Sequence, residues 1–289
     1  MKSVGIILLV LSMVSCQGTD DRFPDQAADL HRLLSADSPV YPIVSAHRGG
    51  PAKGLPENAL ETFRVSSSAG LMLIECDVAM TSDSVLVLYH DDTLGRTSTG
   101  KGLISTWTWD SLQSVNLIDP LGFETGLRIP RFDSVLVWAK DRTLLAVDIK
   151  RTVPIDQVLR VLGNYRAADR ATIITYRGED AVYIHQQNPD LHLSVTIRNL
   201  DEWYQFRQTG IPVGQVMAFT GLEEPPAELL DTLHRNGIAS IIGTFRSADL
   251  LQDSTRRKSW VSLLSSGYRI LATDHPLLAD ELIDSLKSE

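Results

Sequence analysis

The amino-acid sequence predicts an α/β fold, a (β/α)8 barrel of the TIM type. Eight short apolar runs alternate with segments of helical length, and several of these runs end abruptly in charged or polar residues. The chain length of 289 residues suits one barrel of about 250 residues. The eight predicted strands are residues 43–46, 71–77, 144–149, 171–175, 193–197, 213–219, 238–242 and 268–272.

The N-terminus is interpreted as an export signal outside the fold. Lys2 precedes an apolar stretch, and Cys16 stands at the cleavage position. Residues 14–16 resemble the lipobox of bacterial lipoproteins, in which the cysteine is lipidated and becomes the new N-terminus. We therefore expect residues 1–16 to be a lipoprotein signal peptide with lipidated Cys16, and residues 17–39 to be a polar tether. An ordinary secretory signal or a short membrane anchor is the alternative.

The remaining residues, 40–289, are predicted to form one barrel domain, exported and anchored to a membrane, facing the periplasm or the cell surface. The formal net charge of −9 argues against a nucleic-acid partner, because such binding needs a basic stripe. Cys76 is the one cysteine of this domain, so no disulfide within the chain is expected. Strand alternation turns Cys76 into the packing, and it is not a candidate nucleophile.

The helical segments follow the same alternation. Between the later strands, apolar residues recur among polar ones over segments of helical length. Helices are predicted at residues 132–140, 155–165, 178–187, 226–235 and 247–266.

A hairpin is predicted directly after the second strand. Residues 81–84 have the composition of a turn, and the apolar residues 85–90 form the return strand. A turn centred on residues 83 and 84 places Asp77 opposite His90 in an antiparallel pair. A carboxylate and a histidine would then face one site.

Polar residues gather where four of the predicted strands end. In a barrel of this kind, functional residues lie at or just beyond the C-terminal ends of the strands. We therefore expect these residues to share one mouth. They are His47 and Arg48, Glu75 and Asp77, Asp148 and Lys150, and residues 273–276.

The acidic residues favour a metal site. Glu75 and Asp77 are two apart on a strand and project to the same face, where each carboxylate raises the pKa of the other unless a cation neutralises them. A hard divalent ion, Ca²⁺ or Mg²⁺, is the economical solution, with Asp148 as the third oxygen ligand and Glu57 in a supporting position. Zinc is less favoured, because neither a sulfur ligand nor an H-E-x-x-H pattern is present. The alternative to a metal site is that Glu75 and Asp77 are simply the solvated end of a strand.

The bases and cations favour a phosphodiester substrate. His47 and His90 can both titrate near neutral pH, as a general acid–base pair requires. Arg48 and Lys150 in the same mouth, together with a metal ion, would stabilise charge on a phosphate. A glycosidase would use a carboxylate pair without this positive charge.

As a set, these motifs resemble the glycerophosphodiester phosphodiesterase family. The resemblance covers nearly all of the barrel domain and is strongest in its first half. The matching motifs are Ser45-Ala46-His47-Arg48-Gly49, Pro56-Glu57-Asn58, Glu75-Cys76-Asp77-Val78, Leu88-Tyr89-His90-Asp91, Leu94-Gly95-Arg96-Thr97, Ile129-Pro130-Arg131-Phe132, Asp148-Ile149-Lys150 and Thr273-Asp274-His275-Pro276.

The resemblance implies a TIM barrel that hydrolyses glycerophosphodiesters to an alcohol and sn-glycerol 3-phosphate with Ca²⁺ or Mg²⁺. A neighbouring glycerol hydroxyl attacks phosphorus first, and water then opens the cyclic phosphate. The segment between His90 and Ile129 resembles a small insertion that covers the substrate. The implied roles are general acid and base for His47 and His90, metal binding for Glu75, Asp77 and Asp148, and phosphate binding for Arg48 and Lys150.

Three positions depart from the family pattern. Asp148 stands where the family usually has glutamate, so this carboxylate is one methylene shorter. Ala59 replaces the usual threonine after Pro-Glu-Asn. No late Trp-Thr-x-Asn-like motif is found, and residues 241–245 occupy its place, which changes the pocket wall and leaves the alcohol group open.

Two other functions remain open from the sequence. A phospholipase-like lyase acting on intact lipids would need an apolar rim, which Trp107, Trp109 and Leu121 could form; packing within the insertion is the simpler interpretation of these residues. A degenerate barrel that only binds phosphorylated ligands is disfavoured, because both histidines, the acids and both cations are present together.

Overall fold

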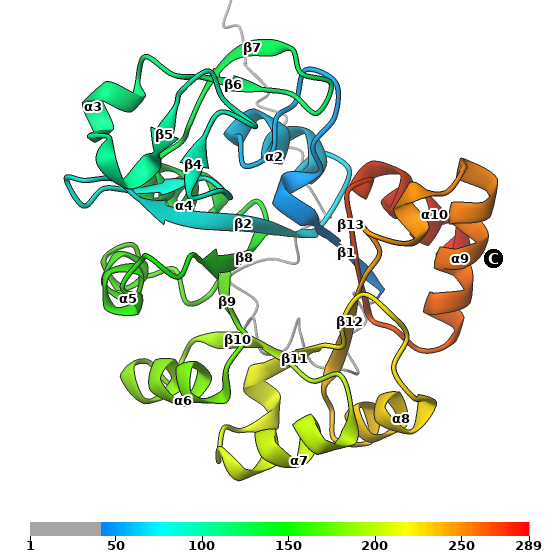
Figure 1. Cartoon of the computed structure of the whole chain (residues 1–289). Helices are drawn as coiled ribbons and strands as arrows, with labels where there is room; N and C mark the ends of the chain where they lie inside the picture. Colours follow the sequence, from blue (N-terminus) through cyan, green and yellow to red (C-terminus); the bar gives the residue numbers. More distant parts are fainter. Residues whose placement is uncertain (1–41, 289) are drawn as a thin grey trace, which may run out of the picture.

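Eight parallel strands form a closed barrel in the computed structural model, which describes residues 42–288 (Figure 1). Strand β1 pairs in parallel with both β2 and β13, so the first and last strands meet and no sheet edge is left in the ring. The predicted (β/α)8 barrel is confirmed. The strands are β1 (Ile43–Ala46), β2 (Met72–Met80), β8 (Leu144–Ile149), β9 (Ala171–Thr175), β10 (His192–Thr196), β11 (Val216–Phe219), β12 (Ala239–Gly243) and β13 (Ile270–Thr273).

Helices surround this ring and cover its outer face (Figure 1). They are α2 (Leu60–Ser67), α4 (Phe132–Ala139), α5 (Ile155–Asn164), α6 (Gly178–Gln187), α7 (Leu200–Gln208), α8 (Ala227–Arg235), α9 (Asp253–Ser265) and α10 (Pro276–Ser288). The predicted helix 247–266 is instead a 3-10 turn, Ala248–Leu250, followed by α9. The break arises because Leu251 and Gln252 are extended, while Asp249 bonds to the end of β13.

Side chains along β2 alternate between the hydrophobic core and the face that carries the candidate site residues. Met72, Ile74 and Cys76 are fully buried in the hydrophobic core that includes residues of the surrounding helices. Leu73 joins a second cluster formed by barrel strands, and Glu75 lies on the same face as Leu73 because side chains on a strand alternate. The predicted packing role of Cys76 is therefore confirmed.

The hairpin after β2 forms, but with a register one residue away from the prediction. Val78 pairs with Leu88 of β3 (Leu86–Leu88), and the Asp77 carbonyl accepts a hydrogen bond from the Tyr89 amide at 2.9 Å. Asp77 therefore lies opposite Tyr89, and the prediction that it lies opposite His90 is wrong.

The register differs because the hairpin loop has an odd number of residues. The Thr81 amide donates to the Val85 carbonyl, so the loop has three residues rather than two or four. Ser84 closes it in the left-handed region at φ 62°. His90 consequently follows the last residue of the hairpin ladder and is free to turn toward the barrel mouth.

Residues 91–128 form the small insertion beside the barrel mouth (Figure 1). Its elements are β4 (Thr93–Leu94), β5 (Gly102–Leu103), α3 (Trp109–Leu112), β6 (Asn116–Ile118) and β7 (Glu124–Arg128). Trp107 and Trp109 pack against a hydrophobic cluster that the insertion shares with the β2–β3 hairpin, whereas Leu121 is 61% exposed. Among residues 42–288, no helix has the length and apolar character of a bilayer-spanning helix.

We expect Gly49→Ala to lower the free energy of unfolding by about 3 kcal/mol or more, from backbone strain and overpacking together. Gly49 has φ +86°, and a Cβ atom there would lie 2.3 Å from the ring of buried Phe63. Gly54→Ala is the matched control, because Gly54 has φ +76° but open space around its Cβ position. Urea denaturation of both variants isolates the steric contribution; equal losses of stability would contradict it.

Candidate active site

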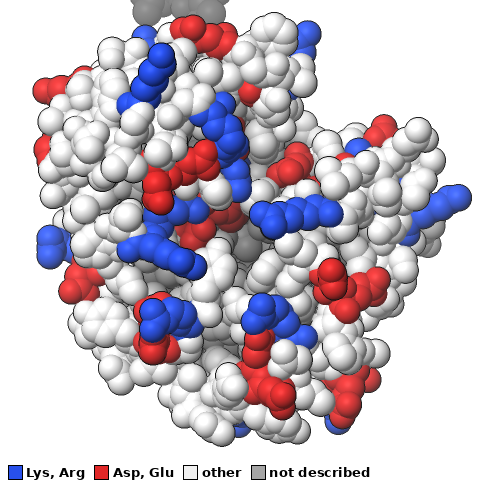
Figure 2. Space-filling view, in the orientation of Figure 1, with Lys and Arg blue, Asp and Glu red and all other residues white. Residues whose placement is uncertain are grey.

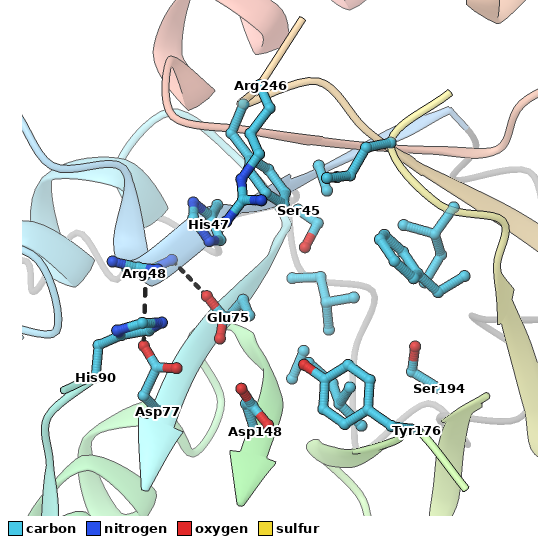
Figure 3. Close-up of a pocket in the computed structure, with 18 residues that line it drawn as sticks. Ser45, His47, Arg48, Glu75, Asp77, His90, Asp148, Tyr176, Ser194 and Arg246 are labelled. Carbon is cyan, nitrogen blue, oxygen red and sulfur yellow. Dashed lines mark hydrogen bonds and ion pairs between the residues drawn. The ribbon is translucent and has the colours of Figure 1, made fainter. Parts of the chain in front are cut away.

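A cavity of about 320 Å³ opens at the C-terminal ends of the barrel strands. Charged residues from β1, β2, β3 and β8 or their following loops line one side, and apolar residues such as Ile174 and Ile241 line the other. Figure 3 shows the charged side chains converging on this space. Six of the predicted site residues line it together, namely His47, Arg48, Glu75, Asp77, His90 and Asp148.

Three carboxylates form the acidic cluster of this cavity. Each of Glu75, Asp77 and Asp148 offers one oxygen, and these oxygens lie within 4.8 Å of one another. The strands impose this arrangement, because Asp77 of β2 pairs in register with Asp148 of β8. Burial, with the nearby charges of Asp77 and Asp148, raises the pKa of Glu75 well above its ordinary value. Three carboxylate oxygens this close together, on buried or half-buried side chains, fit a hard divalent cation.

Lys150 partly neutralises the acidic cluster. Its Nζ lies 2.5 Å from Asp77 Oδ1 and 3.1 Å from Asp148 Oδ2. Burial alone would raise the pKa of Asp77, but the charge of Lys150 and hydrogen bonds from Lys150 and Asn58 lower it overall. Arg48 also lies 3.8 Å from Asp77 but is shared with Glu57, so negative charge remains on the three carboxylates. Lys150 contacts the acids rather than the cavity wall, and its predicted contact with phosphate stays a prediction.

Asn58 orients Asp77, a role that the sequence analysis missed. Its Nδ2 donates to Asp77 Oδ2 at 2.7 Å, and its Oδ1 accepts from the Asp77 amide at 2.9 Å. Asn58 is buried and has φ 58°, a left-handed conformation that asparagine tolerates better than most residues. An asparagine directly after the candidate residue Glu57 was the available signal.

Arg48 joins the acidic cluster to Glu57. The Arg48 amide donates to Glu75 Oε2 at 2.6 Å, and its Nη1 donates to Glu57 Oε2 at 3.1 Å. Its Nε is buried, has no hydrogen-bond acceptor, and lies 3.8 Å from Asp77 Oδ2. Glu57 thus supports the arginine and does not belong to the cluster of carboxylates.

A chain of ion pairs leads from Glu57 to His90. Arg96 donates to both oxygens of Glu57, at 2.7 and 3.0 Å, and to Asp91 Oδ2 at 2.6 Å. Hydrogen bonding from Arg96 lowers the pKa of Asp91 to about 2. Asp91 Oδ1 lies 2.6 Å from His90 Nδ1, so a charged carboxylate holds this ring and leaves its Nε2 for other partners.

His47 is held in a similar way from the opposite end of the chain. Its Nδ1 lies 2.7 Å from Asp274 Oδ1, although 227 residues separate the two. The His47 ring stacks on Phe245, with ring centroids 3.9 Å apart and planes 8° apart. Closure of the barrel between β1 and β13 makes the contact with Asp274 possible.

Asp249 holds the backbone of Asp274 in place. Its carboxylate is buried and accepts hydrogen bonds from Thr244 Oγ1 at 2.6 Å, from Thr273 Oγ1 at 2.7 Å and from the Asp274 amide at 2.7 Å. The rule that chemistry lies at strand ends placed residues 273–276, and so Asp274, at the predicted mouth, but it did not reveal that Asp274 holds His47. Asp249 was missed because it lies in a segment predicted as helix.

Tyr176 was also missed. It directly follows β9 and lines the cavity beside Asp148 (Figure 3). The same rule of strand ends would have identified it.

A model of the glycerophosphoryl diester phosphodiesterase family matches residues 47–277 of the chain. The chain belongs to this family. The predicted resemblance is thus confirmed, and the protein is an enzyme of the phosphodiesterase class. A crystal structure of a glycerophosphoryl diester phosphodiesterase from Parabacteroides distasonis is 34% identical, with a TM-score of 0.82, covering 85% of this chain and 87% of that one.

Two further relatives are more distant. A glycerophosphodiester phosphodiesterase of Caldanaerobacter subterraneus is 26% identical over 160 residues, which cover 53% of this chain and 65% of the relative. The match therefore spans about two thirds of that curated relative. An Oleispira antarctica phosphodiesterase, solved in complex with the product sn-glycerol-3-phosphate, is 18% identical with a TM-score of 0.67, covering 84% of this chain and 97% of that one. It shares the fold.

We expect Asp249→Asn to lower the free energy of unfolding by about 1–3 kcal/mol, because the new amide NH₂ cannot accept the hydrogen bonds that the carboxylate oxygen accepts. Asp253→Asn is the matched control, since Asp253 lies on the neighbouring helix α9 and its side chain is 75% exposed. Its ion pair with Arg256 contributes about 0–1 kcal/mol. Chemical denaturation compares the two variants, and equal effects would show that the buried hydrogen bonds of Asp249 add nothing.

Proposed function

We propose that this protein hydrolyses glycerophosphodiesters to an alcohol and sn-glycerol 3-phosphate in a reaction that depends on a divalent cation. The observation that carries the proposal is the pairing of two histidines with the acidic cluster in one cavity. His47 and His90 each have Nδ1 held by an aspartate, at 2.7 and 2.6 Å, and both line the cavity with the three carboxylates. The product complex of the Oleispira antarctica relative supports the choice of product.

Glu75, Asp77 and Asp148 would hold the ion, Ca²⁺ or Mg²⁺. Lys150 pairs with Asp77 and Asp148, and Arg48 is shared between Asp77 and Glu57. The three carboxylates therefore keep an excess of negative charge that a divalent cation would neutralise, and carboxylate oxygens suit both ions. When bound, the ion would supply positive charge that stabilises the negative charge developing on the phosphate. Asn58 and the Arg48 amide keep two of the three ligands oriented.

Arg48 is placed to hold the phosphate. Arg48 lines the cavity, and its buried Nε has an ion-pair contact with Asp77 at 3.8 Å but no hydrogen-bond acceptor, so a phosphate oxygen would supply the missing acceptor. Lys150, beside Asp77 and Asp148, would add positive charge near the phosphate.

The two histidines would transfer the protons. An aspartate that accepts from Nδ1–H leaves Nε2 able to accept a proton and stabilises the imidazolium that forms. One histidine would take the proton of the attacking glycerol hydroxyl, and the other would give a proton to the leaving alcohol. Water would then open the cyclic phosphate, with the roles of the two histidines exchanged.

A water-soluble diester is favoured over an intact lipid. Of the three residues that could have formed an apolar rim, Trp107 and Trp109 pack against a hydrophobic cluster, and Leu121 is the one that is largely exposed. The degenerate-barrel alternative is disfavoured, because the acids, both histidines and Arg48 line one cavity. The predicted lipoprotein signal, residues 1–16, and the tether, residues 17–39, lie outside the described residues; we propose that they export the barrel and anchor it at a membrane surface.

We expect the barrel domain to release glycerol 3-phosphate from glycerophosphoethanolamine or glycerophosphocholine with Ca²⁺ or Mg²⁺ but not with a chelator. His47→Ala and His90→Ala should each lower kcat by about 10²–10⁴-fold, the usual contribution of a positioned acid or base. An enzyme-coupled assay of glycerol 3-phosphate measures this. Folded protein that binds a divalent ion yet turns over no glycerophosphodiester would refute the proposed reaction.

We expect Asn58→Gly to weaken divalent-ion binding about 10–100-fold, because it removes both hydrogen bonds that orient Asp77 while keeping the left-handed backbone. Asp141→Gly is the matched control: Asp141 has φ 60°, is exposed and lies outside the cavity. Isothermal titration with Ca²⁺ and Mg²⁺ measures both variants. Wild-type affinity in the Asn58 variant would mean that Asp77 needs no such support.

A further inference from the structure

A second cavity adjoins the catalytic one. It has a volume of about 530 Å³ and lies between the insertion and the barrel, with Ile118 and Asp119 on one wall and Asp274 on another. The two cavities share four lining residues, His47, Arg48, Phe245 and Arg246. A phosphodiester bound at this junction has two substituents, and each cavity can receive one of them.

The proposed reaction determines which substituent of the phosphodiester occupies which cavity. The attacking hydroxyl belongs to glycerol, so in the proposed function glycerol must lie with the acidic cluster in the catalytic cavity. The leaving alcohol then extends into the second cavity. Its chemical nature can be inferred from the charges on that cavity's walls.

The carboxylates of the second cavity already have partners. Glu57 accepts from Arg48 and Arg96, and Asp274 holds His47. Asp119 accepts from the backbone amides of Gly54 at 2.8 Å and of Leu121 and Phe123 at 2.9 Å each, and these bonds lower its pKa. Each of these acids therefore already has hydrogen-bond or ion-pair partners that compete with a cationic substituent.

Arg246 is the arginine of this cavity that pairs with no carboxylate of the described residues. Arg48 and Arg96 both pair with Glu57, whereas Arg246 makes no ion pair within residues 42–288. Figure 3 shows Arg246 extending from the loop after β12 toward His47 and the cavity. In Figure 2, basic and acidic side chains surround the central hollow of this face.

The backbone that presents Arg246 is anchored. The Thr244 amide donates to the Ala272 carbonyl at 2.8 Å, and the Ser247 amide donates to the Thr244 carbonyl at 3.0 Å. Thr244 is also tied to the buried Asp249. Arg246 is therefore presented by a fixed turn, which reduces the entropy lost when its side chain binds a ligand.

A quaternary ammonium group finds no matching surface here. Such groups are recognised by several aromatic faces. Phe245 is the one aromatic side chain among the described residues that line the second cavity, and one face of its ring is stacked on His47. An acceptor-rich anionic group, by contrast, suits the planar guanidinium of Arg246.

We infer that the second cavity is the subsite for the leaving alcohol and that Arg246 selects an alcohol bearing a carboxylate or a second phosphate. This inference rests on the proposed function. It names the substrate class as glycerophosphodiesters whose head group carries an additional negative charge.

Two substrates that differ by one carboxylate test this directly. Glycerophosphoserine is glycerophosphoethanolamine with a carboxylate added to the head group. We expect wild-type enzyme to show a kcat/KM about tenfold higher for glycerophosphoserine than for glycerophosphoethanolamine. A tenfold ratio corresponds to the lower end of the free energy that one charge-assisted hydrogen bond contributes. Arg246→Gln should abolish this ratio, and Arg246→Glu should reverse it. Arg64→Gln, on the outer helix α2, is the matched control and should keep the ratio.

The outcomes separate the two proposals. Turnover of both diesters with equal efficiency, or a preference that Arg246→Gln leaves unchanged, would overturn the inference and leave the proposed function standing. Absence of any turnover would refute the proposed function. In that case, calorimetric binding of glycerophosphoserine and glycerophosphoethanolamine decides the subsite: equal binding, or binding insensitive to Arg246→Gln, would overturn the inference as well.

Discussion

Buried negative charge at the ends of β2 and β8 is the constraint around which the site is built. Strand pairing places Glu75, Asp77 and Asp148 together, and burial makes their mutual repulsion costly. Neighbouring groups partly compensate this charge. Lys150 pairs with Asp77 and Asp148, and the Arg48 amide donates a hydrogen bond to Glu75. Burial first, and then the charges of Asp77 and Asp148, raise the pKa of Glu75 above its ordinary value. Such a site is suited to receive a divalent cation.

The two histidines are positioned by the same contact but through different parts of the fold. Asp91, the next residue along the chain, holds His90 and is itself held by Arg96 of the insertion. Asp274 holds His47 only because β13 closes the barrel against β1. The orientation of one ring thus depends on the insertion, and that of the other depends on barrel closure.

The loop after β12 connects catalysis to substrate choice. Thr244 and Asp249 anchor the end of β13 and hence Asp274, while Phe245 and Arg246 between them face the cavities. The buried anchors Thr244 and Asp249 flank the half-buried Phe245 and the exposed Arg246. A change at position 246 can therefore alter the leaving-group subsite with little effect on the acidic cluster, which lies on β2 and β8.

The sequence by itself determined the barrel and the acidic half of the site. Apolar runs bounded by charge gave the strands to within a few residues, and the two-residue period of a strand put Glu75 and Asp77 on one face. The hairpin register was mispredicted because one left-handed residue, Ser84, makes the loop odd, and local composition does not encode that parity. Only the tertiary structure decided the contacts of His47 with Asp274 and Phe245 and the place of Arg246. These contacts join the two ends of the chain, and they exist only once eight strands have closed into a ring.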